Sequence, residues 1–325
     1  MKSLNGSDLA GFIKERQAKA VRSLRQANGI VPKLVIIRTN PDPVVDSYMR
    51  LKSSYGSDIL VDVEVLTIGQ SEAIDVIKKL NKDDTVHGII VQIPLPDTSQ
   101  TNEILNTVAP EKDVDGLRDS SAPWPLHADE AQGSGEKRTK RTSGTESESR
   151  SQTDTAIRRE PAGLAGLSSQ QGGVVYGSGF DAPTPMAINW LLTGYNVELQ
   201  GRKIVIVGHG RLVGKPLAKM WQHSGFDVTI VDKKVADLKE ITRHADVLVC
   251  ATGVPGLITS GMVNPEAAIV DAGVATDSNG LVGDVAASVR NLPNITITPE
   301  KGGVGPLTVC ALFENVIQAA RNSKS

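Results

Sequence analysis

A glycine-rich turn is the stretch of this sequence best suited to binding chemistry. Gly208, Gly210 and Gly214 follow the apolar, β-branched run 203–207 and precede a helical pattern, which together indicate a buried strand, a turn and a helix. The amides of such a turn and the N-terminus of the helix can hold a pyrophosphate. The pattern predicts a dinucleotide-binding crossover, although tight strand–helix turns also use glycine for steric reasons alone.

Residues after the next strands support the same prediction. A second apolar run, 227–231, begins about 20 residues after the turn and ends in Asp232, where a carboxylate commonly binds the ribose. Thr252 and Gly253 follow the third predicted strand, and Gly273 follows the fourth. A nicotinamide would lie at these strand ends.

A second group of polar residues lies in the N-terminal half. Tyr48 and Lys52 are four residues apart and share one face of a predicted helix. On this spacing alone, such a pair most often belongs to an ordinary exposed helix face. Gln92 ends the predicted strand 85–92, because the prolines that follow cannot continue a central strand. Ligands of open α/β sheets bind beyond the carboxyl ends of the strands, which makes Gln92 a candidate binding residue.

The elements that position these residues alternate between strand and helix, which predicts two α/β domains. In the first half we expect strands at 33–38, 61–66 and 85–92 in a small parallel sheet, helices at 7–26, 71–80 and 99–108, and a helix carrying Tyr48 that Asp46 or Ser47 caps. In the second half we expect a helix at 186–192 preceded by Pro183 and Pro185, strands at 203–207, 227–231, 247–250, 268–271 and 294–298, a glycine turn at 302–308 and a closing helix at 309–320.

The middle of the chain has a different composition. From 127 to 156 there is no aliphatic residue larger than alanine and no Phe, Tyr or Trp. Such a stretch cannot bury enough apolar area to offset chain entropy, so we predict a disordered insert over 119–178. Its basic run 137–141 is interpreted as a solvated tether rather than a polyanion site. The predicted domains are 1–118, completed by a C-terminal helix 306–322, and a Rossmann-like domain over 179–305.

Composition limits the partners and the compartment. The 325 residues carry a formal net charge of −2, which gives no reason to expect a nucleic-acid partner. The two cysteines, Cys250 and Cys310, lie in apolar surroundings and fit a reduced compartment. The N-terminus has no signal-peptide core and no apolar run is long enough to span a membrane. We expect a cytoplasmic protein without a membrane partner, and no set of metal ligands is singled out.

Five motifs in this order resemble the bifunctional methylenetetrahydrofolate dehydrogenase/cyclohydrolase family. Residues 48–52 match its Tyr-x-x-x-Lys, residues 91–96 its Val-Gln-Leu-Pro-Leu-Pro, and residues 112–116 its Lys-Asp-Val-Asp-Gly. Residues 282–285 and 302–308 match two late signatures. The resemblance covers nearly the whole chain except 119–178. It implies oxidation of methylenetetrahydrofolate and hydrolysis of the methenyl product to formyltetrahydrofolate, within one-carbon metabolism and purine biosynthesis.

The resemblance also implies roles for individual residues. Lys52 matches the catalytic lysine, a residue type whose pKa falls on desolvation or beside a cation. Gln92 would hold that lysine, Tyr48 would pack near the folate ring, and Asp115 would accept hydrogen bonds from the pterin. The implied substrate contacts are Tyr48, Gln92, Pro94, Leu95, Asp115, Gly302, Gly303, Pro306 and Thr308. Turn geometry is an alternative reason for Asp113, Gly302 and Gly303, and both roles can hold at once.

The implied cofactor-binding residues are Gly208, His209, Gly210, Arg211, Gly214, Asp232, Lys233, Thr252, Gly253 and Gly273. His209 and Gly210 replace the usual Arg and Ser of the family's turn, and Asp232 favours NAD because it repels a 2′-phosphate. Lys233, Lys234 and Arg211 favour NADP, the nucleotide of most of the family. We predict NADP, with NAD as the alternative.

The family usually forms homodimers through the nucleotide domain, so we expect a homodimer, and apolar faces at 186–192 or 215–221 are compatible with it. The alternatives to the bifunctional enzyme are a member with one activity that uses NAD and a folate- or nucleotide-binding homologue with impaired catalysis. The presence of Tyr48, Lys52, Gln92 and Asp115 favours the enzyme.

Overall fold

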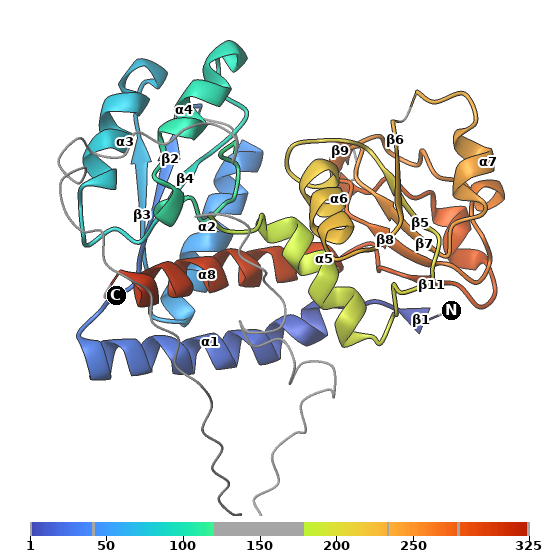
Figure 1. The fold of residues 1–325 in the computed structure, drawn as a ribbon, viewed down its shortest axis with the longest axis horizontal. Helices are drawn as coiled ribbons and strands as arrows, with labels where there is room; N and C mark the ends of the chain where they lie inside the picture. Colours follow the sequence, from blue (N-terminus) through green and yellow to red (C-terminus); the bar gives the residue numbers. More distant parts are fainter. Residues whose placement is uncertain (1, 41–42, 120–178, 233, 278–279, 324–325) are drawn as a thin grey trace, which may run out of the picture.

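The computed structural model describes residues 2–40, 43–119, 179–232, 234–277 and 280–323 (Figure 1). The predicted insert 119–178 therefore falls, apart from Asp119, outside the described residues, as does Lys233. Within the described part, two parallel sheets form separate α/β bodies, as the alternating pattern predicts. No helix of the described part is both long and apolar enough to cross a membrane.

The smaller sheet has the strand order β3-β2-β4. Strand β2 (Lys33–Arg38) lies in the centre and pairs in parallel with β3 (Asp62–Thr67) and β4 (Gly88–Val91). Strand β4 and the centre of β2 are aliphatic and fully buried, as is usual for parallel strands covered on both faces. The helices of this body are α2 (Pro43–Asp58), α3 (Ala73–Asn81) and α4 (Thr101–Thr107), with short 3₁₀ turns before α3 and α4.

The larger sheet has six strands in the order β1-β11-β8-β7-β5-β6, all paired in parallel. Its strands are β5 (Ile204–Val207), β6 (Val228–Val231), β7 (Val247–Cys250), β8 (Ala268–Asp271), β11 (Thr296–Ile297) and β1 (Lys2–Ser3). Strand β1, which joins this sheet from the other end of the chain, is not predicted from the sequence. It also did not predict the antiparallel hairpin of β9 (Ala275–Asp277) and β10 (Gly280–Val282).

Three predicted helix starts are wrong, and proline explains each of them. Helix α5 (Pro183–Gly194) begins at Pro183, and α8 (Val304–Asn322) begins five residues before the predicted 309. Helix α2 begins at Pro43, so Asp46 and Ser47 lie inside its first turns and neither is the cap. First-turn amides have no partner within the helix, so proline is favoured there instead of breaking the helix.

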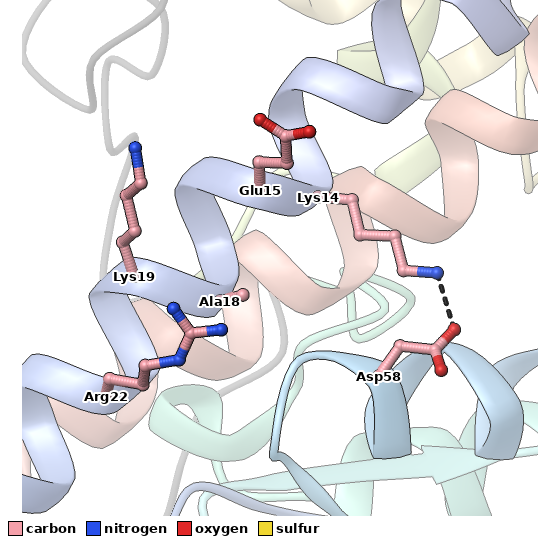
Figure 2. Close-up of a pocket in the computed structure, with 6 residues that line it drawn as sticks. All are labelled: Lys14, Glu15, Ala18, Lys19, Arg22 and Asp58. Carbon is pink, nitrogen blue, oxygen red and sulfur yellow. Dashed lines mark hydrogen bonds and ion pairs between the residues drawn. The ribbon is translucent and has the colours of Figure 1, made fainter.

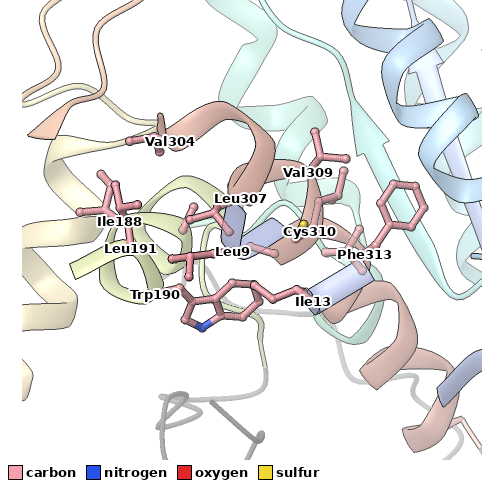
Figure 3. Close-up of a cluster of buried hydrophobic side chains, with 14 of the residues drawn as sticks. Leu9, Ile13, Ile188, Trp190, Leu191, Val304, Leu307, Val309, Cys310 and Phe313 are labelled. Atoms are coloured by element: carbon pink, nitrogen blue, oxygen red, sulfur yellow. The ribbon is translucent and has the colours of Figure 1, made fainter. Parts of the chain in front are cut away.

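Helices α1 (Gly6–Asn28), α5 and α8 pack together and join the two bodies (Figures 1 and 3). Their shared core includes Leu9 and Ile13 from α1, Trp190 from α5, and Leu307 and Phe313 from α8, all at most 4% exposed. Helix α8 also contacts β2 and β4 of the smaller sheet. Burial of large aliphatic and aromatic groups is the main stabilising term of such a junction. Helix α6 (Gly214–His223) and the short α7 (Leu238–Thr242) complete the fold.

Candidate functional site

Gln92 lies directly beyond the carboxyl end of β4, as predicted. Its backbone N–H donates to the Ile37 carbonyl at 2.9 Å, which fixes the residue beside the neighbouring strand. Its side-chain Nε2 donates to the Ile93 carbonyl at 3.1 Å. The side-chain Oε1 is buried and accepts no hydrogen bond from the described residues. Burying an oxygen without a hydrogen bond costs free energy. Oε1 of Gln92 is therefore available to accept a hydrogen bond from a donor that is brought to the site.

Helix α2 brings Tyr48 and Lys52 to the same part of the molecule. Tyr48 is 38% exposed, which leaves its ring open to a ligand, and Lys52 is half-buried. The charge of Lys52 acts on Asp115, whose pKa is raised above its ordinary value mainly by burial and is lowered in part by Lys52. The structure thus brings the predicted lysine and the predicted aspartate into electrostatic contact.

Asp113 and Asp115 are two residues apart and have different surroundings. The Asp113 carboxylate accepts hydrogen bonds from the backbone N–H groups of Arg118 at 2.9 Å and Leu117 at 3.3 Å. Burial raises its pKa to about 6, and these two hydrogen bonds oppose that rise. Asp113 therefore stabilises the turn, as the geometric alternative predicts, and leaves Asp115 as the candidate ligand-binding carboxylate.

The chain that returns from the insert passes directly beside this turn. Gly116 has a left-handed φ of 62°, and a Cβ there would lie 2.7 Å from the Phe180 carbonyl oxygen. The buried Asn315 of α8 donates through Nδ2 to the Val114 carbonyl at 2.8 Å and the Asp181 carbonyl at 2.9 Å. One amide thus joins the segments on either side of the insert.

The other predicted folate contacts come from two further segments of the chain. Pro94 is exposed, whereas Leu95 is 3% exposed and packs in the core of the smaller sheet. Gly302 has φ 82° and its carbonyl accepts a 3.0 Å hydrogen bond from the Ser7 N–H, while Gly303 caps α8. The half-buried Pro306 and Thr308 lie in the first two turns of α8, not in a glycine turn.

The glycine turn after β5 has the geometry of a phosphate-binding loop. A Cβ on Gly208 would lie 2.4 Å from the Ala251 carbonyl oxygen, and one on Gly214 would lie 1.9 Å from the Gly208 carbonyl oxygen. Steric reasons therefore require both glycines. A Cβ on Gly210 would meet nothing within 4 Å, which leaves open space over the turn. In the first turn of α6, the Lys215 N–H donates to the Gly210 carbonyl at 3.0 Å and the Leu217 N–H donates to the Val213 carbonyl at 2.9 Å, while Pro216 has no N–H. Val213 offers no side-chain cap, so the Gly214 N–H is the amide of this turn that an anion could meet.

Two polar residues near this turn make hydrogen bonds within the protein that the sequence does not predict. His209 is exposed, and Arg211 donates to Asn102 Oδ1 on α4, a contact that links the turn to the smaller body. Asp232 follows β6 and is exposed, and its Oδ1 accepts a 2.9 Å hydrogen bond from the Lys234 N–H. The carboxylate shapes its own turn and can still face a ribose.

Two residues without a predicted role organise the ends of β7 and β8. Asp284 is fully buried and accepts hydrogen bonds from Thr252 and Val254, while Asp271 accepts from Gly273, Asp284 and Val285. These bonds fix Thr252, Gly253 and Gly273 beside one another. In the sequence, Asp284 stood out only as part of a motif, and Asp271 only as the last residue of a strand.

A surface hollow lies away from these residues, between α1 and the end of α2 (Figure 2). It is lined by Lys14, Glu15, Ala18, Lys19, Arg22 and Asp58, and Lys14 forms an ion pair with Asp58 at 2.5 Å. Asp58 lies shortly before β3 begins, at the amino end of the smaller sheet, whereas Gln92 lies at the carboxyl end. The hollow is not part of the candidate site.

Comparisons with known proteins agree on one family. The tetrahydrofolate dehydrogenase/cyclohydrolase catalytic domain matches residues 4–115, and the NAD(P)-binding domain of the same family matches residues 182–324. Proteins named bifunctional protein FolD from an Exiguobacterium species and from Methanosarcina barkeri are 33% and 32% identical over 98% of this chain, and the matches cover 98% and 96% of those proteins.

Solved structures give the same result. The bifunctional enzyme FolD of Campylobacter jejuni is 30% identical, with a TM-score of 0.77 and 99% of both chains covered. A methylenetetrahydrofolate dehydrogenase of the silkworm Bombyx mori is 26% identical, with a TM-score of 0.76 and coverage of 100% of this chain and 99% of that one.

Proposed function

The chain belongs to the tetrahydrofolate dehydrogenase/cyclohydrolase family, and we propose that it carries out both reactions of that family's name. In this proposal it oxidises 5,10-methylenetetrahydrofolate to 5,10-methenyltetrahydrofolate with NADP and hydrolyses that product to 10-formyltetrahydrofolate. Two observations support the proposal: the charge of Lys52 acts on the Asp115 carboxylate, and Gln92, with its unpaired Oε1, lies directly beyond the carboxyl end of β4.

On the folate side, each side chain has a role suited to its surroundings. The half-buried Asp115 carboxylate accepts hydrogen bonds from the pterin's amino and ring nitrogens, a paired-donor edge that a carboxylate matches. The partly exposed ring of Tyr48 packs against the folate. The Oε1 of Gln92 has no partner among the described residues, and in the complex with substrate it would accept a hydrogen bond from Lys52 and hold the lysine in place.

Lys52 transfers protons in the hydrolytic step. Water adds to the methenyl carbon, a carbon–nitrogen bond of the ring breaks, and the departing nitrogen gains a proton. A lysine next to the reacting carbon can shuttle these protons when its site is partly desolvated, as it is here. Positioned acid–base groups of this kind contribute about 10²–10⁴ in rate.

On the nucleotide side, the residues present fit a dinucleotide. The open space over Gly210 and the first-turn N–H of Gly214 suit a pyrophosphate, and Asp232 would bind the ribose. When bound, the nicotinamide accepts the hydride of the oxidation. Thr252, Gly253 and Gly273 supply the backbone against which the ring lies. Arg211 and Lys234 favour the 2′-phosphate of NADP electrostatically, each by a modest amount where solvent screens the charge.

The assembly and domain limits are part of the proposal. We place the catalytic domain at 1–118 with helix 306–322, and the nucleotide domain at 179–305.

We also propose a cytoplasmic homodimer formed through the nucleotide domain. The apolar residues of α5 and α6 are largely buried within the chain, whereas the β9–β10 hairpin region exposes Val274 (57%) and Leu281 (56%). That exposed pair supports a subunit contact, which sedimentation at micromolar concentration tests: a monomeric mass would reject it.

A spectrophotometric assay tests the function. The protein is mixed with methylenetetrahydrofolate and with NADP or NAD in turn, and methenyl formation and its later decay are followed. We expect oxidation with a preference for NADP, followed by enzymatic hydrolysis. The absence of both reactions would reject the proposal. A preference for NAD that Lys233→Ala leaves unchanged would reject the choice of nucleotide alone.

A further inference from the structure

Asp284 lies fully buried beneath the loop that follows β7. Its Oδ2 accepts hydrogen bonds from the backbone N–H of Thr252 at 2.5 Å and from Thr252 Oγ1 at 2.9 Å. Its Oδ1 accepts from the Val254 N–H at 3.0 Å. One carboxylate thus fixes three consecutive residues, 252–254, at the carboxyl end of a central strand.

Asp271 forms the second half of the arrangement. It is the last residue of β8, and its Oδ1 accepts hydrogen bonds from the Gly273 N–H at 3.2 Å and the Asp284 N–H at 3.0 Å. Its Oδ2 accepts from the Val285 N–H at 3.0 Å. Asp271 therefore holds the backbone of Asp284, and Asp284 in turn holds the β7 loop.

Two glycines show how closely the carboxylates approach the backbone. A Cβ on Gly273 would lie 2.0 Å from Asp284 Oδ1, and a Cβ on Gly283 would lie 2.0 Å from Asp271 Oδ2. No side chain fits at either position while the aspartates stay in place. Glycine is therefore required where the strand ends must approach the two carboxylates.

Holding two carboxylates in this way costs more free energy than a purely structural role requires. All the hydrogen-bonding partners above are amides or a hydroxyl, none of which carries a charge. Burial raises the pKa of Asp271, and the hydrogen bonds from Val285 and Asp284 oppose that rise. Burying carboxylates without a cation costs stability that an apolar core would not lose. The hydrogen bonds of the carboxylates fix the backbone at two neighbouring strand ends.

We propose that Asp284, held by Asp271, is a positioning residue for the dehydrogenase reaction, because it fixes the loops after β7 and β8 against which the nicotinamide ring lies. The inference rests on the proposed nucleotide site and assigns the pair no part in hydrolysis. It also predicts that the adenosine half of the nucleotide, which would lie near β5 and β6, binds independently of the pair.

The variant Asp284→Asn tests this assignment. The substitution conserves the volume of the side chain but turns an amide N–H toward one of the backbone N–H groups, which then loses its acceptor. We expect this lost hydrogen bond to lower dehydrogenase kcat/KM for NADP by about tenfold or more. Binding of NADP should weaken, while binding of adenosine 2′,5′-bisphosphate, which lacks the nicotinamide, should not change. Hydrolysis of supplied methenyltetrahydrofolate should also continue at the wild-type rate. Asp227→Asn changes an exposed aspartate before β6 and should alter none of these readouts.

Asp271→Asn is measured in parallel and should give the same division between readouts. Normal dehydrogenase activity in Asp284→Asn would overturn the inference. If both variants lose hydrolysis and adenosine 2′,5′-bisphosphate binding together with dehydrogenase activity, the pair serves the fold and the inference also fails. A wild-type protein without dehydrogenase activity would instead reject the proposed function.

Discussion

The carboxyl ends of the two sheets present different kinds of groups to the ligands that we propose for them. At the smaller sheet, side chains extend from α2 and the strand-end turns, and key atoms such as Gln92 Oε1 and the Asp115 carboxylate have no protein hydrogen bond among the described residues. At the larger sheet, the carboxylates of the half-buried Asp271 and the buried Asp284 both accept hydrogen bonds, and the groups that they hold in place are mainly backbone.

This difference fits two kinds of chemistry. Proton transfer needs side chains whose hydrogen bonds are left for the substrate, so that desolvation and charge act on the reacting groups. Binding a dinucleotide needs amides and glycine in a fixed arrangement, because the cofactor carries the reactive atoms itself. The following predictions test whether the two regions can be disabled separately.

The largest effect is expected for Lys52→Met. Loss of the proton-transferring group should lower hydrolysis of methenyltetrahydrofolate by about 10²-fold or more, without change in the far-ultraviolet circular dichroism spectrum. Lys79→Met, which alters an exposed lysine on α3, is the matched control. Near-normal hydrolysis by Lys52→Met would show that the assignment is wrong.

A smaller loss, confined to the other region, is expected for Gly273→Ala. The added methyl group would collide with Asp284 Oδ1 and displace the β8 loop, so dehydrogenase kcat/KM should fall by about tenfold, in line with the cost of overpacking. Gly261→Ala, whose Cβ would meet nothing closer than 3.9 Å, is the control. Unchanged dehydrogenase activity would contradict the tight fit between the glycine and the carboxylate.

Asp115→Asn should make the protein inactive but more stable. Because burial raises the pKa of Asp115 above 3.8 in the folded state, folding is penalised once this group must ionise, and wild-type stability falls as pH rises through the raised pKa. The asparagine variant should therefore melt about 2 °C higher at pH 7.5, and the gain should disappear as pH falls toward 3.8. Asp75→Asn, at an exposed site, should show no such gain. A lower Tm for Asp115→Asn at pH 7.5 would refute the argument.

Deletion of residues 127–156 should have the smallest effect. These residues offer nothing apolar to pack, and Asn315 already joins the segments on either side of the insert. We expect a Tm within a few degrees of wild type by calorimetry. A large drop would mean that the insert docks on the folded body.

The sequence predicts an element accurately where one type of residue dominates the segment. Strands β2, β7 and β8 were predicted to the residue, because short aliphatic runs between turns have few other solutions. The starts of α5 and α8 differ from the prediction for two reasons. Pro183 is a first-turn residue of α5 and does not precede the helix, and the glycines of 302–308 favour a turn where α8 already begins at Val304. Strand β1 could not be predicted, since two residues carry no periodicity and their partner Thr296 lies at the far end of the chain.

The candidate site also contains residues that local sequence marks and residues that it does not mark. Lys52, Gln92 and Asp115 could be predicted as site residues because motifs and strand ends mark them one at a time, and their roles stay predictions. The interlocked Asp271 and Asp284 were missed, since their role depends on a contact between two loops thirteen residues apart. Nothing in either local sequence indicates which amides a buried carboxylate will accept.

The central claim is that hydrolysis depends on the side chains of one region and not on the backbone of the other. Its most direct test is the rate at which Lys52→Met and Gly273→Ala hydrolyse methenyltetrahydrofolate supplied without nucleotide. We predict a rate near background for Lys52→Met and a rate near wild type for Gly273→Ala. Equal losses in the two variants, or hydrolysis retained by Lys52→Met, would contradict the account.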